Sequence, residues 1–143
     1  MWLTGEFVDV MAPLWRLHDN NRQMLNDLAT DGPIVNRTVA WIVQELHAEL
    51  VEASPKLTTT LASAHRGVAG GHEGLLFIDP NVQNPIFGGF PAIYGEEVHE
   101  TGAFGGLGKP KPWWRETVED KGDQILAAGL LLLEADIETA WKQ

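Results

Sequence analysis

The stretch "PIVNRTVAWIVQELHAELVEASP", residues 33 to 55, decides the fold because it carries the clearest helical pattern in the chain. Its apolar residues recur at i, i+3, i+4 and i+7, which places them on one face of an α-helix. Proline is tolerated in the first turn of a helix, and the residue before a proline is pushed out of the α region. We therefore predict a helix from Pro33 to Ala53, ended by Ser54-Pro55. The residues expected on its buried face are Val35, Val39, Ile42, Val43, Leu46 and Leu50.

Toward the N-terminus, a second helical pattern runs from Val8 to Leu28, with Pro13 in its first turn. The sequence "TDGP", Thr30 to Pro33, separates the two helices, because glycine suits a helix C-cap and proline suits a helix start. The first ten residues contain acids and no basic region, so we do not expect them to form a secretory signal. Residues 1 to 53 are therefore expected to be helical.

Toward the C-terminus, the pattern changes between Ser54 and Pro112, which contains eleven of the 15 glycines and therefore favours turns and loops. Residues 64 to 68, the turn "AGGH" and residues 74 to 79 predict a β-hairpin. The apolar run in its second strand predicts a strand covered on both faces. A third strand is expected from Ala92 to His99. These strands predict an antiparallel sheet in residues 54 to 111.

The last segment, residues 112 to 143, predicts one long helix. Gly122 and Gly129 fall on its apolar stripe, although each glycine costs about 1 kcal/mol relative to alanine. Two interpretations stay open: poor helix propensity that is merely tolerated, or the close approach of another segment. With the rest of the chain, this helix predicts a single α+β domain over residues 1 to 143, a small antiparallel sheet packed by two N-terminal helices and the C-terminal helix.

Composition narrows the classes of function. The formal net charge of −10 disfavours tight binding of nucleic acid, although it is compatible with a surface past which DNA slides. The absence of cysteine excludes disulfides, thiolate metal sites and cysteine nucleophiles. The longest apolar run, Ile125 to Leu133, is far shorter than the roughly 20 residues that cross a bilayer, so no membrane association is expected.

Catalytic and metal motifs are weak. In "LHAEL", His47 and Glu49 match the first half of a zinc-deaminase signature, but its cysteine half is missing, so both are expected on the polar side of their helix. A strand over "EEVHE" would place Glu97 and His99 on one face, where His72 or Glu73 of the hairpin could complete a metal site. An acidic edge strand explains the same residues more simply.

The glycine-rich "GAFGGLGKP", residues 102 to 110, fails as a phosphate-binding loop. Ala103 stands where the motif needs glycine, and Pro110 stands where it needs serine or threonine. The two serines, Ser54 and Ser63, lie outside any G-x-S-x-G motif. We therefore expect no catalytic residues, no metal and no cofactor, and we expect that the protein is not an enzyme.

Read in order, three passages resemble the tail-completion, or head–tail joining, proteins of long-tailed bacteriophages. Residues 53 to 66, "ASPKLTTTLASAHR", are similar to that family's "aP..TG.L..Si", with Thr60 at the usual glycine. Residues 92 to 102, "AIYGEEVHETG", are similar to its "YA.yVEfGT" strand. The passage "GGLGKPKPWW" is similar to the "a.PFl.pA" that precedes the family's last helix, with Trp113 and Trp114 at the aromatic position. The resemblance covers residues 33 to 143.

This resemblance implies a structural virion protein of the phage neck that has no catalytic residues. Such proteins are made in the host cytoplasm and assemble into rings, usually hexamers, around the channel that carries genomic double-stranded DNA. The expected partners are further copies of the chain and the neighbouring head-connector or stopper, tail-terminator and tail-tube proteins. A tail terminator or a head-side stopper is the alternative within the same neck, and a small metal-dependent enzyme that uses Glu97, His99 and His72 is the alternative outside it.

Aromatic residues and long loops indicate where subunits would meet. Trp41 and one of Trp113 and Trp114 are expected in the core, and the segments 87 to 91 and 101 to 112 are expected to be mobile until assembly. The predicted interface residues are Trp2, Phe87, Phe90, Tyr94, Phe104, Leu107, Trp113, Trp114 and Trp141.

Overall fold

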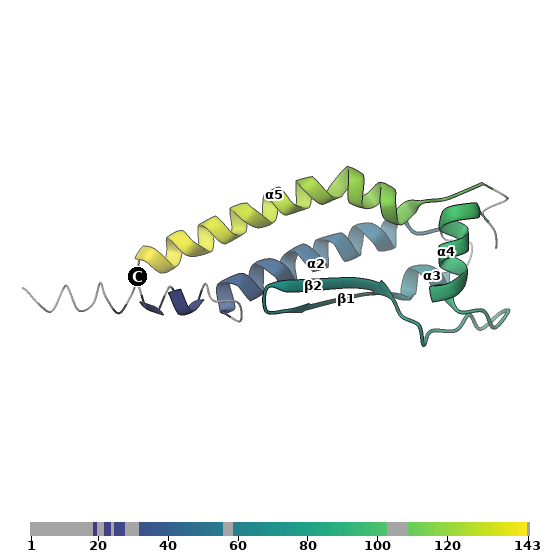
Figure 1. The fold of residues 1–143 in the computed structure, drawn as a ribbon, viewed down its shortest axis with the longest axis horizontal. Helices are drawn as coiled ribbons and strands as arrows, with labels where there is room; N and C mark the ends of the chain where they lie inside the picture. The colour runs from purple at the N-terminus through teal and green to yellow at the C-terminus, as the bar shows by residue number, and fades with distance from the viewer. Residues whose placement is uncertain are drawn as a thin grey trace, which may run out of the picture.

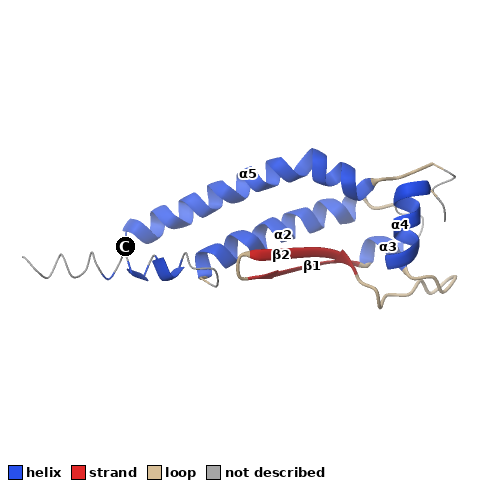
Figure 2. Cartoon of the chain, in the orientation of Figure 1, coloured by secondary structure: helices blue, strands red, loops and turns tan. Residues whose placement is uncertain are grey.

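The computed structural model describes residues 19, 22, 23, 25 to 27, 32 to 55, 59 to 102 and 109 to 142, and it shows an elongated α+β protein (Figures 1 and 2). Two long helices run side by side, a β-hairpin lies along one of them, and two short helices lie at one end (Figure 1). The predicted α+β class is confirmed. In chain order, the elements are α2 (Pro33–Ala53), α3 (Thr59–Ser63), β1 (His65–Gly70), β2 (Glu73–Ile78), α4 (Pro91–Thr101) and α5 (Trp113–Lys142).

Helix α2 is the centre of the fold, because the hairpin packs on one side of it and α5 packs on the other. Its predicted bounds are confirmed: Pro33 occupies the first turn, and the Ser54 N–H donates to the Leu50 carbonyl at 3.0 Å as the helix ends. Of the predicted stripe, Val43 and Leu50 are buried and the other four residues are half-buried, whereas Ile34 and Thr38, outside the stripe, are buried. Before α2, the described residues between 19 and 27 are helical, and the rest of the predicted Val8–Leu28 helix lies outside the described residues.

The predicted hairpin is confirmed, with antiparallel strands that pair His65 with Ile78 and Gly70 with Glu73. One face of the hairpin lies directly on α2. A Cβ added to Gly67 would lie 2.7 Å from Val43 Cγ1, and one added to Gly74 would overlap the other Val43 methyl group. Glycine at these two positions therefore lets the strands approach the helix closely.

The expectation that β2 is covered on both faces is wrong. Leu76 and Ile78 point toward α2 and the core, where both are partly buried. Leu75 points to the opposite face and is largely exposed, as is Val68, which is paired with it on β1. The two-stranded sheet has a helix on one side only, so a run of apolar residues did not predict burial on both faces.

The third predicted strand is also wrong, since residues 91 to 101 form helix α4. Its buried residues Pro91, Tyr94, Gly95 and Val98 follow helical spacing, and the helix ends where Gly102 adopts a left-handed conformation with φ of 77°. Successive helical residues are about 100° apart, so Glu97 and His99 do not share a face.

The long C-terminal helix is confirmed as α5, and its two glycines differ. A Cβ on Gly129 would lie 2.6 Å from Ile42 Cγ1 of α2, so the close-approach interpretation holds there. A Cβ on Gly122 would meet only Val118 of its own helix, at 3.7 Å. Toward the C-terminal end of α5, Asp136 pairs with Arg37 of α2 at 3.3 Å.

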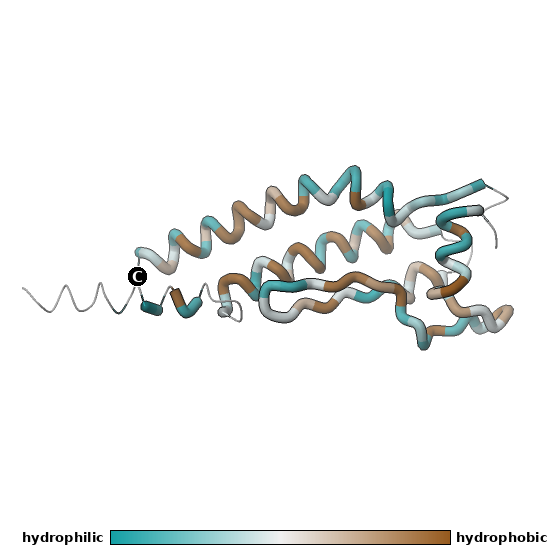
Figure 3. The backbone as a smooth tube through the Cα atoms, viewed as in Figure 1, coloured by the Kyte–Doolittle hydropathy of each residue, from teal (hydrophilic) through white to brown (hydrophobic). Residues whose placement is uncertain are grey.

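The main core lies where the C-terminal end of α2 meets α3, α4 and the first turn of α5. It consists of Leu50, Leu61, Tyr94, Val98 and Trp113, with Leu76, Ile78 and Trp114 packed against it. Hydrophobic residues also recur along both long helices and in the loop before α4 (Figure 3). No helix in the described part of the chain has the length and apolar character needed to span a membrane.

We expect Gly129→Ala to lower the free energy of unfolding by about 1 kcal/mol, because overpacking against Ile42 outweighs the gain in helix propensity. The matched variant Gly122→Ala adds only an ordinary contact with Val118 and should raise this free energy by roughly 0.5–1 kcal/mol. Urea unfolding of both variants measures the difference. Equal stabilisation by the two substitutions would contradict the close packing of α5 on α2.

Candidate functional site

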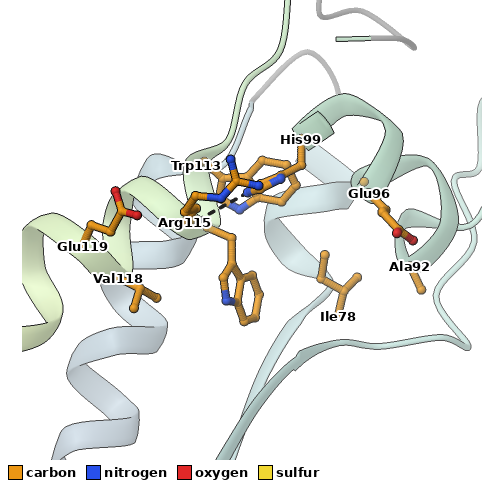
Figure 4. A pocket seen from close by; sticks show the side chains of 10 residues that line it. Ile78, Ala92, Glu96, His99, Trp113, Arg115, Val118 and Glu119 are labelled. Carbon is orange, nitrogen blue, oxygen red and sulfur yellow. Dashed lines mark hydrogen bonds between the residues drawn. The ribbon is translucent and has the colours of Figure 1, made fainter. Parts of the chain in front are cut away.

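A groove of about 510 Å³ lies between the start of α5, helix α4 and the end of β2. Its surface is mainly apolar, with Ile78, Ala92, Trp114 and Val118 among the lining residues. Charged residues stand at its edge. Figure 4 shows the carboxylates of Glu96 and Glu119 on opposite sides of the groove, with Arg115 near His99.

A buried histidine, His65, holds in place the two tryptophans, Trp113 and Trp114, that line this groove. His65 Nδ1 lies 2.9 Å from the Leu61 carbonyl and 3.1 Å from the Ala62 carbonyl, so this nitrogen carries the proton. His65 Nε2 is therefore free to accept the indole N–H of Trp113, at 3.2 Å. The Trp114 ring stacks on the same imidazole, with centroids 5.8 Å apart. Burial lowers the pKa of His65, which favours the neutral form that this bond requires.

Helices α4 and α5 are also joined by polar contacts at the edge of the groove. His99 Nδ1 donates to Glu100 Oε1 at 2.6 Å, and His99 Nε2 accepts the backbone N–H of Arg115 at 3.3 Å. The Arg115 guanidinium binds the same Glu100 oxygen at 2.8 Å. The hydrogen bond from His99 and the charge of Arg115 lower the pKa of Glu100. These contacts orient the two helices.

The same residues offer little chemistry. His99 with Glu100 resembles a base and its orienting carboxylate, but neither serine lies at the groove: Ser63 Oγ donates to the Thr60 carbonyl, and Ser54 is buried at the end of α2. His47, from the partial deaminase signature, donates from Nε2 to the His65 carbonyl at 3.0 Å. Its role in the described structure is therefore to bind the hairpin to α2.

The structure does not assemble the candidate metal site. His72 lies in the hairpin turn beside Glu73, at the opposite end of the hairpin from α4 and His99 (Figure 1). The described residues contain no group of three His, Asp or Glu side chains placed to hold a metal ion. The strand that would have aligned Glu97 with His99 is a helix, which removes the basis for that hypothesis.

A second feature at this end of the molecule is a closed loop around Asn84, which is fully buried. Asn84 N–H donates to the Gly89 carbonyl at 2.7 Å, and Gly88 N–H donates to the Asn84 carbonyl at 2.9 Å. The Asn84 side chain accepts the Ile86 N–H at 2.9 Å. Gly88 has φ of 76°, a conformation that favours glycine. These contacts close the loop in the described structure; mobility of residues 87 to 91 and 101 to 112 before assembly stays a prediction, and residues 103 to 108 lie outside the described residues.

The predicted interface residues fall into four groups: buried, half-buried, exposed, and outside the described residues. Tyr94 and Trp113 are buried in the core, which confirms the expectation that one of the paired tryptophans is a core residue, whereas Trp114 is half-buried. Trp41, also expected in the core, is half-buried. Exposed members of the set are Phe87, Phe90 and Trp141, and the members outside the described residues are Trp2, Phe104 and Leu107.

Sequence reasoning missed His65, Asn84 and the Arg115–Glu100 pair, because their roles depend on partners from other segments. No family model matches this chain, and neither the curated proteins nor the solved structures contain a match. The likeness to tail-completion proteins therefore stays a prediction carried by the passages quoted above.

The free energy of unfolding should fall as the pH is lowered through the window below 6.5, the ordinary pKa of histidine. Burial lowers the pKa of His65 in the folded chain, so the unfolded chain binds this proton more tightly and acid favours unfolding. Chemical unfolding between about pH 5 and 7.5 measures the slope, above the range where most carboxylates titrate. His65→Asn should flatten it, whereas His72→Asn, at an exposed position, should keep it. The same slope in wild type and His65→Asn would contradict the assignment.

Asn84→Ala should lower the free energy of unfolding by about 1–3 kcal/mol, because it removes a buried side chain that accepts the Ile86 N–H and donates to the Tyr94 hydroxyl. Asn81→Ala, at an exposed position of the same loop, should change it by less than about 0.5 kcal/mol. Urea unfolding measures both. A neutral Asn84→Ala variant would show that the loop is closed by its backbone alone.

Proposed function

We propose that this chain is a structural protein of a phage neck, which joins head and tail as an oligomeric ring around the DNA channel. The observation that carries the proposal is the exposed apolar surface at the α4 end of the molecule, where Ile86 is 81% exposed and Ile93 is 67% exposed. Large apolar side chains that stay exposed favour association with another protein surface. At the groove, the polar contacts of His99, Glu100 and Arg115 hold helices α4 and α5 together. These contacts suit a structural role better than a catalytic role.

The order of elements supports the proposal in part. Helix α2 precedes the hairpin, and a long helix ends the chain, as the resemblance to tail-completion proteins implies. The passage that resembles the family's strand is helix α4 in this chain, so that part of the likeness rests on residue types and not on conformation.

The charge of the chain suits a channel for DNA. A ring of subunits that each carry a formal charge of −10 repels phosphate, and it would let the genome pass without binding it. On this proposal the chain resides in the virion, at the head–tail junction. Its partners are further copies of itself and the adjacent neck proteins, and it carries no cofactor and no catalytic role.

Mass photometry of the purified chain, alone and mixed with the connector and tail-tube proteins encoded beside it, tests this function. We expect a ring-sized species in the mixture, because exposed apolar surfaces drive heterologous contacts. A chain that remains monomeric with every neighbouring neck protein would contradict the proposal. A gene far from portal, capsid and tail-tube genes would contradict it as well.

A further inference from the structure

The groove between α4 and α5 carries two carboxylates without a partner at its edges. Glu96 lies on α4 and Glu119 lies on α5, and both side chains are exposed. Figure 4 shows them on opposite sides of the groove. Within the described part of the chain, neither carboxylate makes a hydrogen bond or an ion pair. Both charges are therefore available to a molecule that lies in the groove.

The basic side chain at the groove does not offset these charges. Arg115 lines the groove, but its guanidinium binds Glu100 Oε1 at 2.8 Å. The groove thus keeps the negative charges of Glu96 and Glu119, in a chain whose formal net charge is −10. Like charges oppose the binding of a second copy or of nucleic acid, and they attract a cationic occupant.

The surface between the two carboxylates is apolar and already in place. Ile78, Trp114 and Val118 contribute to it, and Val118 is 45% exposed. The Trp114 ring stacks on the His65 imidazole, with centroids 5.8 Å apart. A side chain that is held before binding loses little conformational entropy when a partner arrives. An occupant that suits this groove therefore carries apolar side chains as well as positive charge.

The shape of the groove favours a segment of a protein chain over a small molecule. Its volume is about 510 Å³, but it is open to solvent. Small-molecule sites usually enclose most of their ligand. Protein segments instead bind open grooves through apolar side chains on one side and leave their other side exposed.

We propose that the α4–α5 groove binds a basic segment of a partner protein, in which Lys or Arg residues flank apolar side chains. The apolar side chains pack on Trp114 and Val118, and the flanking cations pair with Glu96 and Glu119. This inference goes beyond the proposed function, since it names a partner by its chemistry and depends neither on a ring nor on a phage neck.

NMR titration of the whole chain with three synthetic peptides tests the groove. The first peptide has Leu and Phe at its centre, two lysines on each side and blocked ends. The second has glutamate in place of every lysine, and the third has serine in place of Leu and Phe. We expect the first peptide to bind with a Kd below about 1 mM and to shift the Trp114 indole N–H, and the other two to bind at least about tenfold more weakly. Added salt should weaken the binding of the first peptide, because it screens exposed charge pairs.

Matched substitutions assign the charges. Glu96→Gln and Glu119→Gln should each raise the Kd of the first peptide by about twofold to fivefold, and the double variant should raise it by about fivefold or more. The controls Glu97→Gln and Asp120→Asn remove the same charge from the exposed residues next to these two, and neither lines the groove. Both controls should bind the peptide as wild type does. Far-UV circular dichroism of all variants checks that they fold.

Three results would overturn the inference: no binding of the first peptide, binding of the glutamate or serine peptide with equal affinity, or equal weakening by the control substitutions. A second copy as occupant would appear as self-association of the chain that the peptide displaces. A small molecule as occupant would appear as hexylammonium that binds as tightly as the peptide. Either result would replace the partner proposed here.

The proposed function fails separately, by the absence of any complex with neighbouring neck proteins. Peptide binding by a chain that forms no such complex would leave this inference standing. A chain that assembles into a ring but does not bind the first peptide would leave the neck function standing and overturn the inference.

Discussion

The hydrogen bond from the Trp113 indole to His65 is the contact on which the arrangement of the fold depends. Trp113 is the first residue of α5, and His65 begins β1, so one bond sets where the longest helix starts relative to the hairpin. The bond requires a neutral imidazole whose other nitrogen is already used by two carbonyl groups of α3. From this fixed point α5 runs along α2, and α4 is held against the start of α5 by the contacts of His99 and Arg115.

The elements that the sequence predicted correctly are those whose signal is local. Helices α2 and α5 are long, with helical apolar spacing and prolines at their starts, and the hairpin contains its own turn glycines. A strand was predicted from Ala92 to His99, where the structure has helix α4. Eleven residues are too few to separate the two-residue repeat of a strand from the 3.6-residue repeat of a helix by apolar spacing alone. Two local signals there favoured a helix: a proline at the start and a glycine that takes the left-handed C-cap.

Much of the candidate site was beyond sequence reasoning, because its groups meet over long separations. Trp113 and His65 are 48 positions apart, and nothing in the local sequence of either residue names the other. The presence of an aromatic side chain also did not predict whether a residue is buried in the core or exposed at the surface. Tyr94 is a core residue, whereas Phe87, which contacts it, is half exposed. Burial decides that difference, and burial depends on the tertiary fold.

The net charge of −10 and the exposed apolar residues are compatible with the proposed assembly around DNA in a phage neck. We propose a place for this chain in the phage neck. Electron cryomicroscopy of virions made from the genome that encodes this chain tests that claim most directly. We expect a closed ring at the head–tail junction whose density fits the paired helices α2 and α5 in each subunit. A neck resolved at the level of helices, with no density for this pair, would contradict it.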